Sequence, residues 1–306
     1  MTEKENRLQK PLCVALLALV CTALWGSAGA CIKLGYELFD IRDTASRILF
    51  AGCRFALAGV LVIVLGSLLS RRPLLPKKGS ARYILILASV QTVAQYVFYY
   101  IGLSLTAGVR ASILNGSGNF LAILIACFLA RSETFTRQKL LGCLVGLAGV
   151  VLVSLGSEGL GEGSFTGDGA VLLAAAAYGA SSVLIKKYSQ YEDPVVLSGC
   201  QFLLGGLVMM LGAWCCGGRI RAASPAAIPV LLHLALVSAV AYSLWGILLK
   251  HNPVGRIAVY GFTTPIFGVA LSAILLHEGA VLLSPRIPIA LALVSLGIIL
   301  VNRTKE

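Results

Sequence analysis

Long apolar runs recur along the whole of this 306-residue chain and constrain its fold more than any other feature. A helix crosses a bilayer with about 17–25 predominantly apolar residues. Charged residues make up 12% of the chain, against about 25% in soluble domains, which is too few to cover a water-soluble fold of this size. The sequence therefore predicts an all-α membrane protein that crosses a lipid bilayer ten times, at residues 12–34, 45–69, 81–103, 107–130, 139–155, 168–187, 194–216, 226–249, 254–276 and 285–301.

The basic residues that give the net charge of +12 lie almost entirely in the loops, the termini and the span ends. If the N-terminus is cytoplasmic, 17 of the 25 Lys and Arg fall on the cytoplasmic side, and Arg54 alone lies inside a span. Cytoplasmic loops of membrane proteins carry such an excess of basic residues. We therefore expect a multi-pass plasma-membrane protein with both termini in the cytoplasm and no nucleic-acid partner. The apolar stretch after Lys10 imitates a secretion signal, but further spans follow it, so we expect an uncleaved first helix.

The chain also repeats itself at an offset close to 146 residues. The segment "QTVAQYVFYYIGLSLTAGVR" (91–110) matches "VSAVAYSLWGILLKHNPVGR" (237–256), and this match pairs Tyr96 with Tyr242. Three shorter blocks repeat in the same order at nearly the same offset. Self-similarity of this kind is the signature of an internal structural repeat.

Each repeat holds five spans, and an odd number forces the second repeat to enter the membrane from the opposite side. The sequence thus predicts two inverted five-helix repeats at 1–155 and 168–306. A glycine-rich, acidic outer linker at 156–167 joins them. Inverted repeats are common among secondary transporters, which bind substrate near the bilayer midplane.

Several of the repeated blocks resemble the EamA-type branch of the drug/metabolite transporter superfamily. They are "WGSAGACIK", "RFALAG", "FYYIGLSLTAGVRASIL", "LARSE" and "TTPIFGVALSAILLHEG". The resemblance covers both repeats and implies a transporter of small molecules. A proline usual in the fourth span of that family would fall at Asn119, whereas Pro265 is present in the ninth, so the two halves are not expected to bend equally. In that family the fifth and tenth spans scaffold the bundle or form a homodimer contact, and both roles stay open here.

Polar side chains follow one face of three predicted spans. In the third span, Gln91, Gln95 and Tyr99 are four residues apart and therefore share a helical face. Lipid offers such side chains no hydrogen bonds, so they must face protein or water. They either join helices or line a substrate cavity, and we expect the cavity. The candidate cavity residues are Trp25, Arg54, Gln91, Gln95, Tyr99, Ser112, Asn115, Asn119, Ser238, Tyr242, Trp245, Tyr260 and Thr264.

Arg54 is a functional candidate because ionisable residues are costly inside a membrane. Its partner is either a substrate carboxylate or a capping contact with a nearby acid or backbone carbonyl. All 13 Asp and Glu fall in a terminus, a loop or a span end. A multidrug-type carrier that exchanges protons for cationic drugs would need a buried carboxylate, so that mechanism is disfavoured.

Two segments are candidate hinges. Pro265 leaves the carbonyl of Gly261 without its helical partner. Gly116 and Gly118 weaken the fourth span. Each is either a hinge or a structural kink.

The leading interpretation is a secondary transporter that moves a small metabolite by alternating access. An amino acid or a similar neutral or zwitterionic solute fits best, and export is one of the two directions open to it. An intramembrane enzyme and a receptor are the alternatives. No nucleophile pairs with a base, and no buried acid can orient the three histidines, so we expect no catalytic residues, metal or cofactor. The nine cysteines lie in or at the ends of spans and imply no disulfides.

Overall fold

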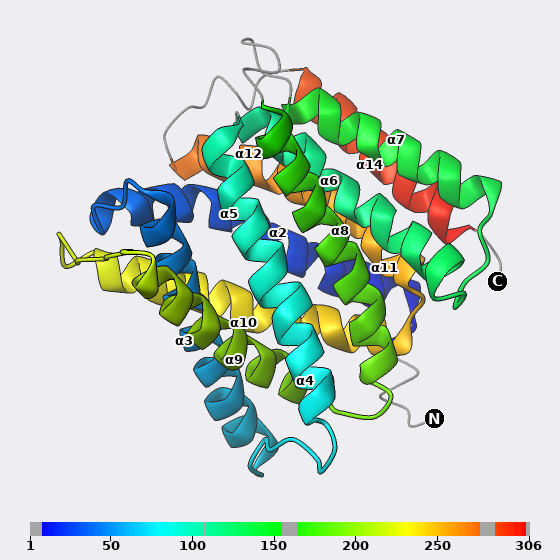
Figure 1. Ribbon diagram of the computed structural model, residues 1–306. Coiled ribbons are helices and arrows are strands. Elements are labelled where there is room, and N and C mark those ends of the chain that lie inside the picture. Colours follow the sequence, from blue (N-terminus) through cyan, green and yellow to red (C-terminus); the bar gives the residue numbers. More distant parts are fainter. Residues whose placement is uncertain (1–7, 107, 155–163, 276–284, 304–306) are drawn as a thin grey trace.

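The computed structural model describes residues 8–106, 108–154, 164–275 and 285–303 (Figure 1). All regular structure within these residues is helical, which confirms the predicted all-α class. The helices are α2 (Pro11–Leu38), α3 (Thr44–Ser70), α4 (Ala81–Leu87), α5 (Gln95–Leu105), α6 (Gly108–Leu124), α7 (Arg137–Ser154), α8 (Phe165–Tyr188), α9 (Pro194–Cys215), α10 (Ala227–His251), α11 (Val254–Ala258), α12 (Thr264–Leu275) and α14 (Arg286–Asn302).

Within the described residues, six helical rods are long and apolar enough to cross a membrane, including the continuous rod 81–105. Two shorter apolar helices lie at 114–129 and 288–302. The chain is therefore a multi-pass membrane protein. The count of ten spans and their inverted arrangement stay predictions.

Polar residues in the connecting turns set where several helices begin. The Asp43 carboxylate accepts a hydrogen bond from the Ser46 N–H at 2.8 Å and caps α3. Asp193 accepts from the Val195 N–H at 2.8 Å at the start of α9, where Pro194 occupies the first helical position. Both devices satisfy or remove N–H groups that a helix start leaves without an internal partner.

Three rods depart from regular α-helix. A π-helical segment, η1 (Ala88–Ala94), joins α4 to α5, and another, η2 (Ile125–Leu129), follows α6. A 3₁₀ segment, η3 (Val259–Thr263), separates α11 from α12, and Pro265 is the second residue of α12. The proline thus lies where the helix changes its winding. By contrast, α6 continues regularly through Gly116 and Gly118.

Glycines let equivalent helices of the two repeats pack closely. In Figure 1, α7 (green) and α14 (red) lie side by side. A Cβ added at Gly142 of α7 would lie 2.8 Å from the Gly297 carbonyl oxygen of α14. Likewise, a Cβ added at Gly206 of α9 would lie 2.3 Å from the Ala56 N of α3. The glycine face of the fifth predicted span is therefore occupied within the chain, and a homodimer through the fifth and tenth spans stays a prediction.

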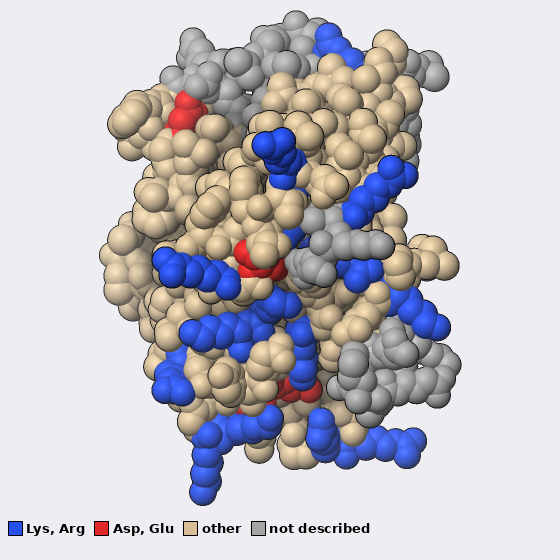
Figure 2. All heavy atoms as spheres, turned by 90° about the vertical axis from the view of Figure 1, so that its right-hand side faces the viewer, with Lys and Arg blue, Asp and Glu red and all other residues tan. Residues whose placement is uncertain are grey.

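The helix ends that are rich in Lys and Arg meet on one side of the molecule. The Lys77 N–H donates to Glu192 at 2.7 Å, and the Gln190 amide donates to the Lys250 carbonyl at 3.2 Å. Figure 2 shows many Lys and Arg side chains and few acidic ones on this side. We call it the basic face. Its contacts include Arg72, Lys77, Lys186, Lys250 and Arg256.

Candidate substrate cavity

A cavity of about 280 Å³ lies between helices of both repeats. The side chains and backbone around it come from α2, α3, α5, α6, α8, α10, η3 and α12. Pockets for small molecules range from about 300 to 1,000 Å³, so this cavity lies just below that range and suits a small metabolite. The predicted residues that line it are Trp25, Arg54, Gln95, Tyr99, Asn115, Asn119, Tyr242 and Thr264, together with Gly116 and Pro265 of the candidate hinges.

Other predicted residues lie elsewhere. Ser238 hydrogen-bonds to a lining residue without lining the cavity itself. Trp245 is packed behind Trp25, with ring centroids 4.9 Å apart. Gln91, Tyr260 and Gly118 are buried outside the lining. The side chain of Ser112 lies outside the part of the chain that the structure describes.

Arg54 brings a positive charge into the cavity while only 3% of the residue is exposed. Its Nε donates to the Leu234 carbonyl oxygen at 3.2 Å and to the Ser238 hydroxyl at 3.0 Å. Among the described residues, no carboxylate forms an ion pair with it. Arginine keeps its proton in proteins and carries five N–H donors. The bonds to Nε therefore fix the side chain but do not neutralise its charge.

The same contact occurs in the other repeat without a charge. Gln201 of α9 stands 147 residues after Arg54, and Gln91 lies one residue before Thr92, the residue that the 146-residue self-match pairs with Ser238. The Gln201 amide donates to the Gln91 amide oxygen, just as Arg54 donates to Ser238. Gln91 therefore joins η1 to α9. A neutral amide is sufficient for this helix contact.

Aromatic rings form one wall of the cavity. The Trp25 and Tyr242 ring centroids are 5.0 Å apart, and the Tyr242 hydroxyl is hydrogen-bonded to that of Tyr96. Tyr96 and Tyr178 also line the cavity, although neither is among the candidates predicted from the sequence. Both could have been found from the repeat, because Tyr96 is matched to Tyr242 and Tyr178 is matched to Trp25.

Two polar atoms at the cavity are buried without a partner in the described structure. They are the indole Nε1 of Trp25, a donor, and the amide Oε1 of Gln95, an acceptor. Buried polar atoms are hydrogen-bonded in the great majority of cases, so each exception calls for an explanation. A polar ligand in the cavity would supply the missing partners.

The chemistry of the lining differs from that of a metal or proton site. Among the described residues, no Asp, Glu or His lines the cavity, and no group of three potential metal ligands occurs. His233 of α10 is exposed and lies outside the cavity. The cavity therefore combines one cation, aromatic surface and neutral hydrogen-bonding groups.

These features define the class of the protein: it is a polytopic helical protein with a small-molecule cavity between two related halves. Comparison with known proteins gives its family. The model of the EamA-like transporter family matches residues 12–155 and 165–303, so the chain belongs to that family. This match confirms the predicted resemblance and the presence of two repeats. It also identifies the protein as a transporter rather than an enzyme.

Individual relatives agree with this assignment. The chain is 27% identical over 273 residues to a protein of Salmonella typhimurium named "Probable amino-acid metabolite efflux pump", covering 86% of each chain. It is 26% identical over 236 residues to "Uncharacterized transporter YvbV" of Bacillus subtilis, covering 76% of this chain and 75% of that one. A crystal structure with 18% sequence identity superposes with a TM-score of 0.75 over 94% of this chain and 95% of the other, which supports the fold alone.

Proposed function

We propose that this protein is a secondary transporter that exports a small carboxylate-bearing metabolite, such as an amino acid. It works by alternating access of two inverted five-helix repeats in the plasma membrane. The observation that carries the proposal is the buried charge of Arg54 at the cavity, without an acidic partner among the described residues. The guanidinium carbon lies 5.1 Å from the centroid of the Phe55 ring, which stabilises the cation in part. A buried charge without an opposite charge is still costly, and a substrate carboxylate would offset that cost.

The repeat argues against a purely structural role for this charge. Gln201 and Gln91 make the equivalent contact with amides alone. The arginine therefore supplies something that helix packing does not require. A zwitterionic substrate also fits the rest of the lining, because aromatic surface attracts an ammonium group and no carboxylate is needed for it.

The relatives support the substrate class. One relative from Salmonella typhimurium and one from Escherichia coli are both named as amino-acid metabolite efflux pumps. The proposed direction, export, rests on the names of these relatives, and the orientation with the basic face inside the cell rests on the excess of Lys and Arg that cytoplasmic loops carry.

Ligand titration of the purified protein tests the proposal. Amino acids are titrated in detergent, each beside the amine that lacks its carboxylate. We expect binding of the amino acid and at least roughly tenfold weaker binding of the amine, because hydrogen bonds to charged groups contribute about 1.5–3 kcal/mol. Arg54→Gln should lose the same factor and keep its fold, since Gln201 already fills the equivalent position. Arg54→Lys should also bind more weakly, because a bidentate fork becomes a point charge.

Equal affinity of Arg54→Gln and the wild type for an amino acid would contradict the carboxylate role of Arg54. Binding of the amine and not of the amino acid would contradict the proposed substrate class. The matched control is Gln201→Asn, which changes the equivalent contact without touching the cavity and should leave affinity unchanged.

A further inference from the structure

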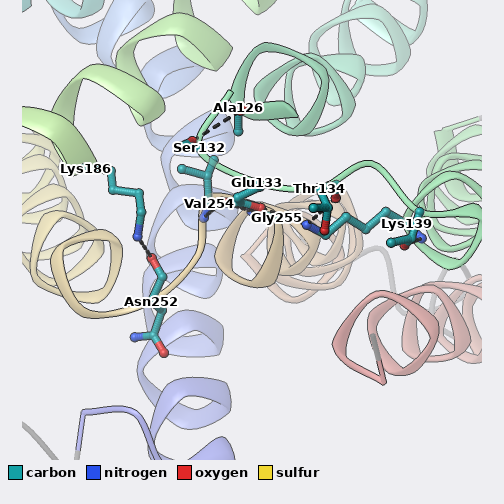
Figure 3. A network of polar contacts seen from close by, with 10 residues as sticks. Ala126, Ser132, Glu133, Thr134, Lys139, Lys186, Asn252, Val254 and Gly255 are labelled. Atoms are coloured by element: carbon teal, nitrogen blue, oxygen red, sulfur yellow. Dashed lines mark hydrogen bonds and ion pairs between the residues drawn. The ribbon is translucent and has the colours of Figure 1, made fainter. Parts of the chain in front are cut away.

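A buried ion pair between Glu133 and Lys139 lies outside the cavity lining. Figure 3 shows it beside the start of α11. The Lys139 Nζ lies 3.1 Å from the Glu133 Oε2, and these side chains are only 3% and 2% exposed. Lys139 also donates to the Thr134 carbonyl oxygen at 3.0 Å. Burying an ion pair costs free energy unless further hydrogen bonds satisfy both groups. The contacts of Glu133 therefore show what the pair holds together.

The Glu133 carboxylate binds the start of a helix in the other repeat. It accepts hydrogen bonds from the N–H groups of Val254 and Gly255, the latter at 3.2 Å to Oε2. These are the first two residues of α11, where backbone N–H groups have no partner inside the helix. A carboxylate is favourable there because the N–H groups at a helix start carry partial positive charge. Glu133 thus ties the segment after η2 to the rod that contains Pro265.

The turn before α11 is also tied to the N-terminal segment. The Asn252 amide donates to the Leu8 carbonyl oxygen at 3.0 Å, and the Arg256 guanidinium donates to the Gln9 carbonyl oxygen at 3.2 Å. Both bonds join the second repeat to the first. The start of α11 is therefore held from two directions at the basic face.

Behind these contacts, packed apolar side chains close the space between the helices. Along α2, Cys21 is fully buried in this cluster, whereas Trp25 one turn later lines the cavity. Along α10, Tyr242 lines the cavity, and Trp245 and Leu248, nearer the basic face, belong to the cluster. The cavity thus lies between two apolar clusters on these helices, one next to the basic face and one on the far side that includes Ala28, Leu234 and Val237.

We propose that Glu133 and Lys139 form a latch that holds the cavity closed toward the basic face and opens once in each transport cycle. The proposal rests on the proposed function, because alternating access requires a closure on this side that can be released. When the carboxylate releases Val254 and Gly255, the segment from Val254 onward is free to move, and η3 with Pro265 is the candidate hinge within it. Both charges are then hydrated, so opening leaves neither of them buried alone. Glu133 acts as a positioning residue and does not touch the substrate.

Native Cys21 is a reporter for this closure. It is buried in the apolar cluster next to the basic face, while Cys13 lies two turns nearer that face on the same helix and is partly exposed. In a chain whose other eight cysteines are replaced, Cys21 is labelled with a polar thiol reagent applied to the basic face of membrane vesicles. We expect slow labelling with Glu133 present and at least about tenfold faster labelling in Glu133→Gln, because one charge-assisted hydrogen bond corresponds to roughly that factor. A chain with Cys13 alone controls for access of the reagent.

Glu192→Gln is the matched control. Glu192 is also a buried carboxylate at the basic face, bound to the Lys77 N–H and to the Ser80 hydroxyl, each at 2.7 Å, but it does not contact α11. This variant should leave Cys21 protected. Equal labelling of Cys21 in Glu133→Gln and the wild type would overturn the latch. Labelling in Glu192→Gln as fast as in Glu133→Gln would also overturn it, because it would indicate a general loosening of the structure. If Glu133→Gln does not fold, Glu133→Asp keeps the charge with a shorter reach and should still label several-fold faster.

Labelling needs no substrate, so it tests the latch separately from transport. Faster labelling in Glu133→Gln together with no binding of any amino acid would uphold the latch and refute the proposed substrate. Unchanged labelling together with intact amino-acid binding would refute the latch and uphold the proposed substrate.

Discussion

The amides of Gln91 and Gln201 bond to each other between η1 and α9, and both residues are fully or almost fully buried. Replacing either one by leucine leaves the other amide buried without that partner. Such a loss costs about 1–3 kcal/mol, whereas replacing both partners with apolar groups can be nearly neutral. We therefore expect Gln91→Leu and Gln201→Leu each to lower the stability of the protein in detergent. The double variant should be more stable than either single variant, as denaturant unfolding can measure. Two single effects that simply add would contradict a direct bond between the amides.

Trp245 and Gln95 should respond to substitution in opposite ways. Trp245 is 1% exposed and packs against Trp25, so Trp245→Ala should cost about 3–5 kcal/mol and reduce the yield of folded protein. The Oε1 of Gln95 has no partner in the described structure, so Gln95→Leu should leave stability nearly unchanged. It should instead weaken substrate binding several-fold. Unfolding curves and ligand titration on the same preparations separate the two effects. Loss of folded Gln95→Leu would contradict this assignment.

Helical periodicity could predict which polar residues point away from lipid, but not what they meet there. Gln95 and Tyr99 line the cavity, while Gln91 on the same predicted face bonds to Gln201. Part of the reason is η1, because a π-helical segment shifts the angular position of the residues before it relative to those after it. No pattern in the sequence marked that segment. Trp245 lies outside the lining and packs against Trp25, which does line the cavity, and this contact joins distant parts of the chain.

At the level of whole helices, the contact between α7 and α14 depends on glycine. A leucine at position 142 would meet the Gly297 carbonyl oxygen and the Val301 side chain, both closer than 3.0 Å already at its Cβ. We expect Gly142→Leu to push the helices apart and to cost about 1–3 kcal/mol, as overpacking typically does. Gly212→Ala in α9 is the control, because nothing lies within 4 Å of its added Cβ. It should be tolerated or slightly stabilising. Thermal unfolding in detergent compares the two, and equal midpoints would contradict the close packing.

Element positions were accessible from the sequence because bilayer thickness sets the length of an apolar run, and because proline, aspartate and serine mark helix starts. The boundaries of α3 and α9 lie within two residues of the predicted spans. The change of winding near Pro265 was also foreseeable from its missing N–H. The regular course of α6 through Gly116 and Gly118 was not, because neighbouring helices can hold a weak helix former in place.

For the molecule as a whole, the basic face predicts orientation. A reporter protein fused after Glu306 should be active in the cytoplasm, and one inserted in the 156–167 linker should be active outside the cell. The reason is that basic segments are retained on the cytoplasmic side. Paired fusions, one reporter that works only inside cells and one that works only outside, measure both positions. An externally active fusion after Glu306 would reverse the proposed orientation and with it the side on which Glu133 closes the cavity.

The difference between Arg54 and Gln201 affects the orientation in which a substrate would bind. In a symmetric pair of identical five-helix chains every side chain occurs twice, so a cation at one helix contact would be matched by a second cation at the equivalent contact. When the two halves are joined in one polypeptide, equivalent positions can carry different residues. Here Arg54 supplies a guanidinium, and its counterpart Gln201 supplies a neutral amide. The Tyr96 and Tyr242 hydroxyls still meet as matched partners. The cavity therefore has similar walls but a single positively charged end. A substrate with a carboxylate would bind in one orientation, with the carboxylate toward that end.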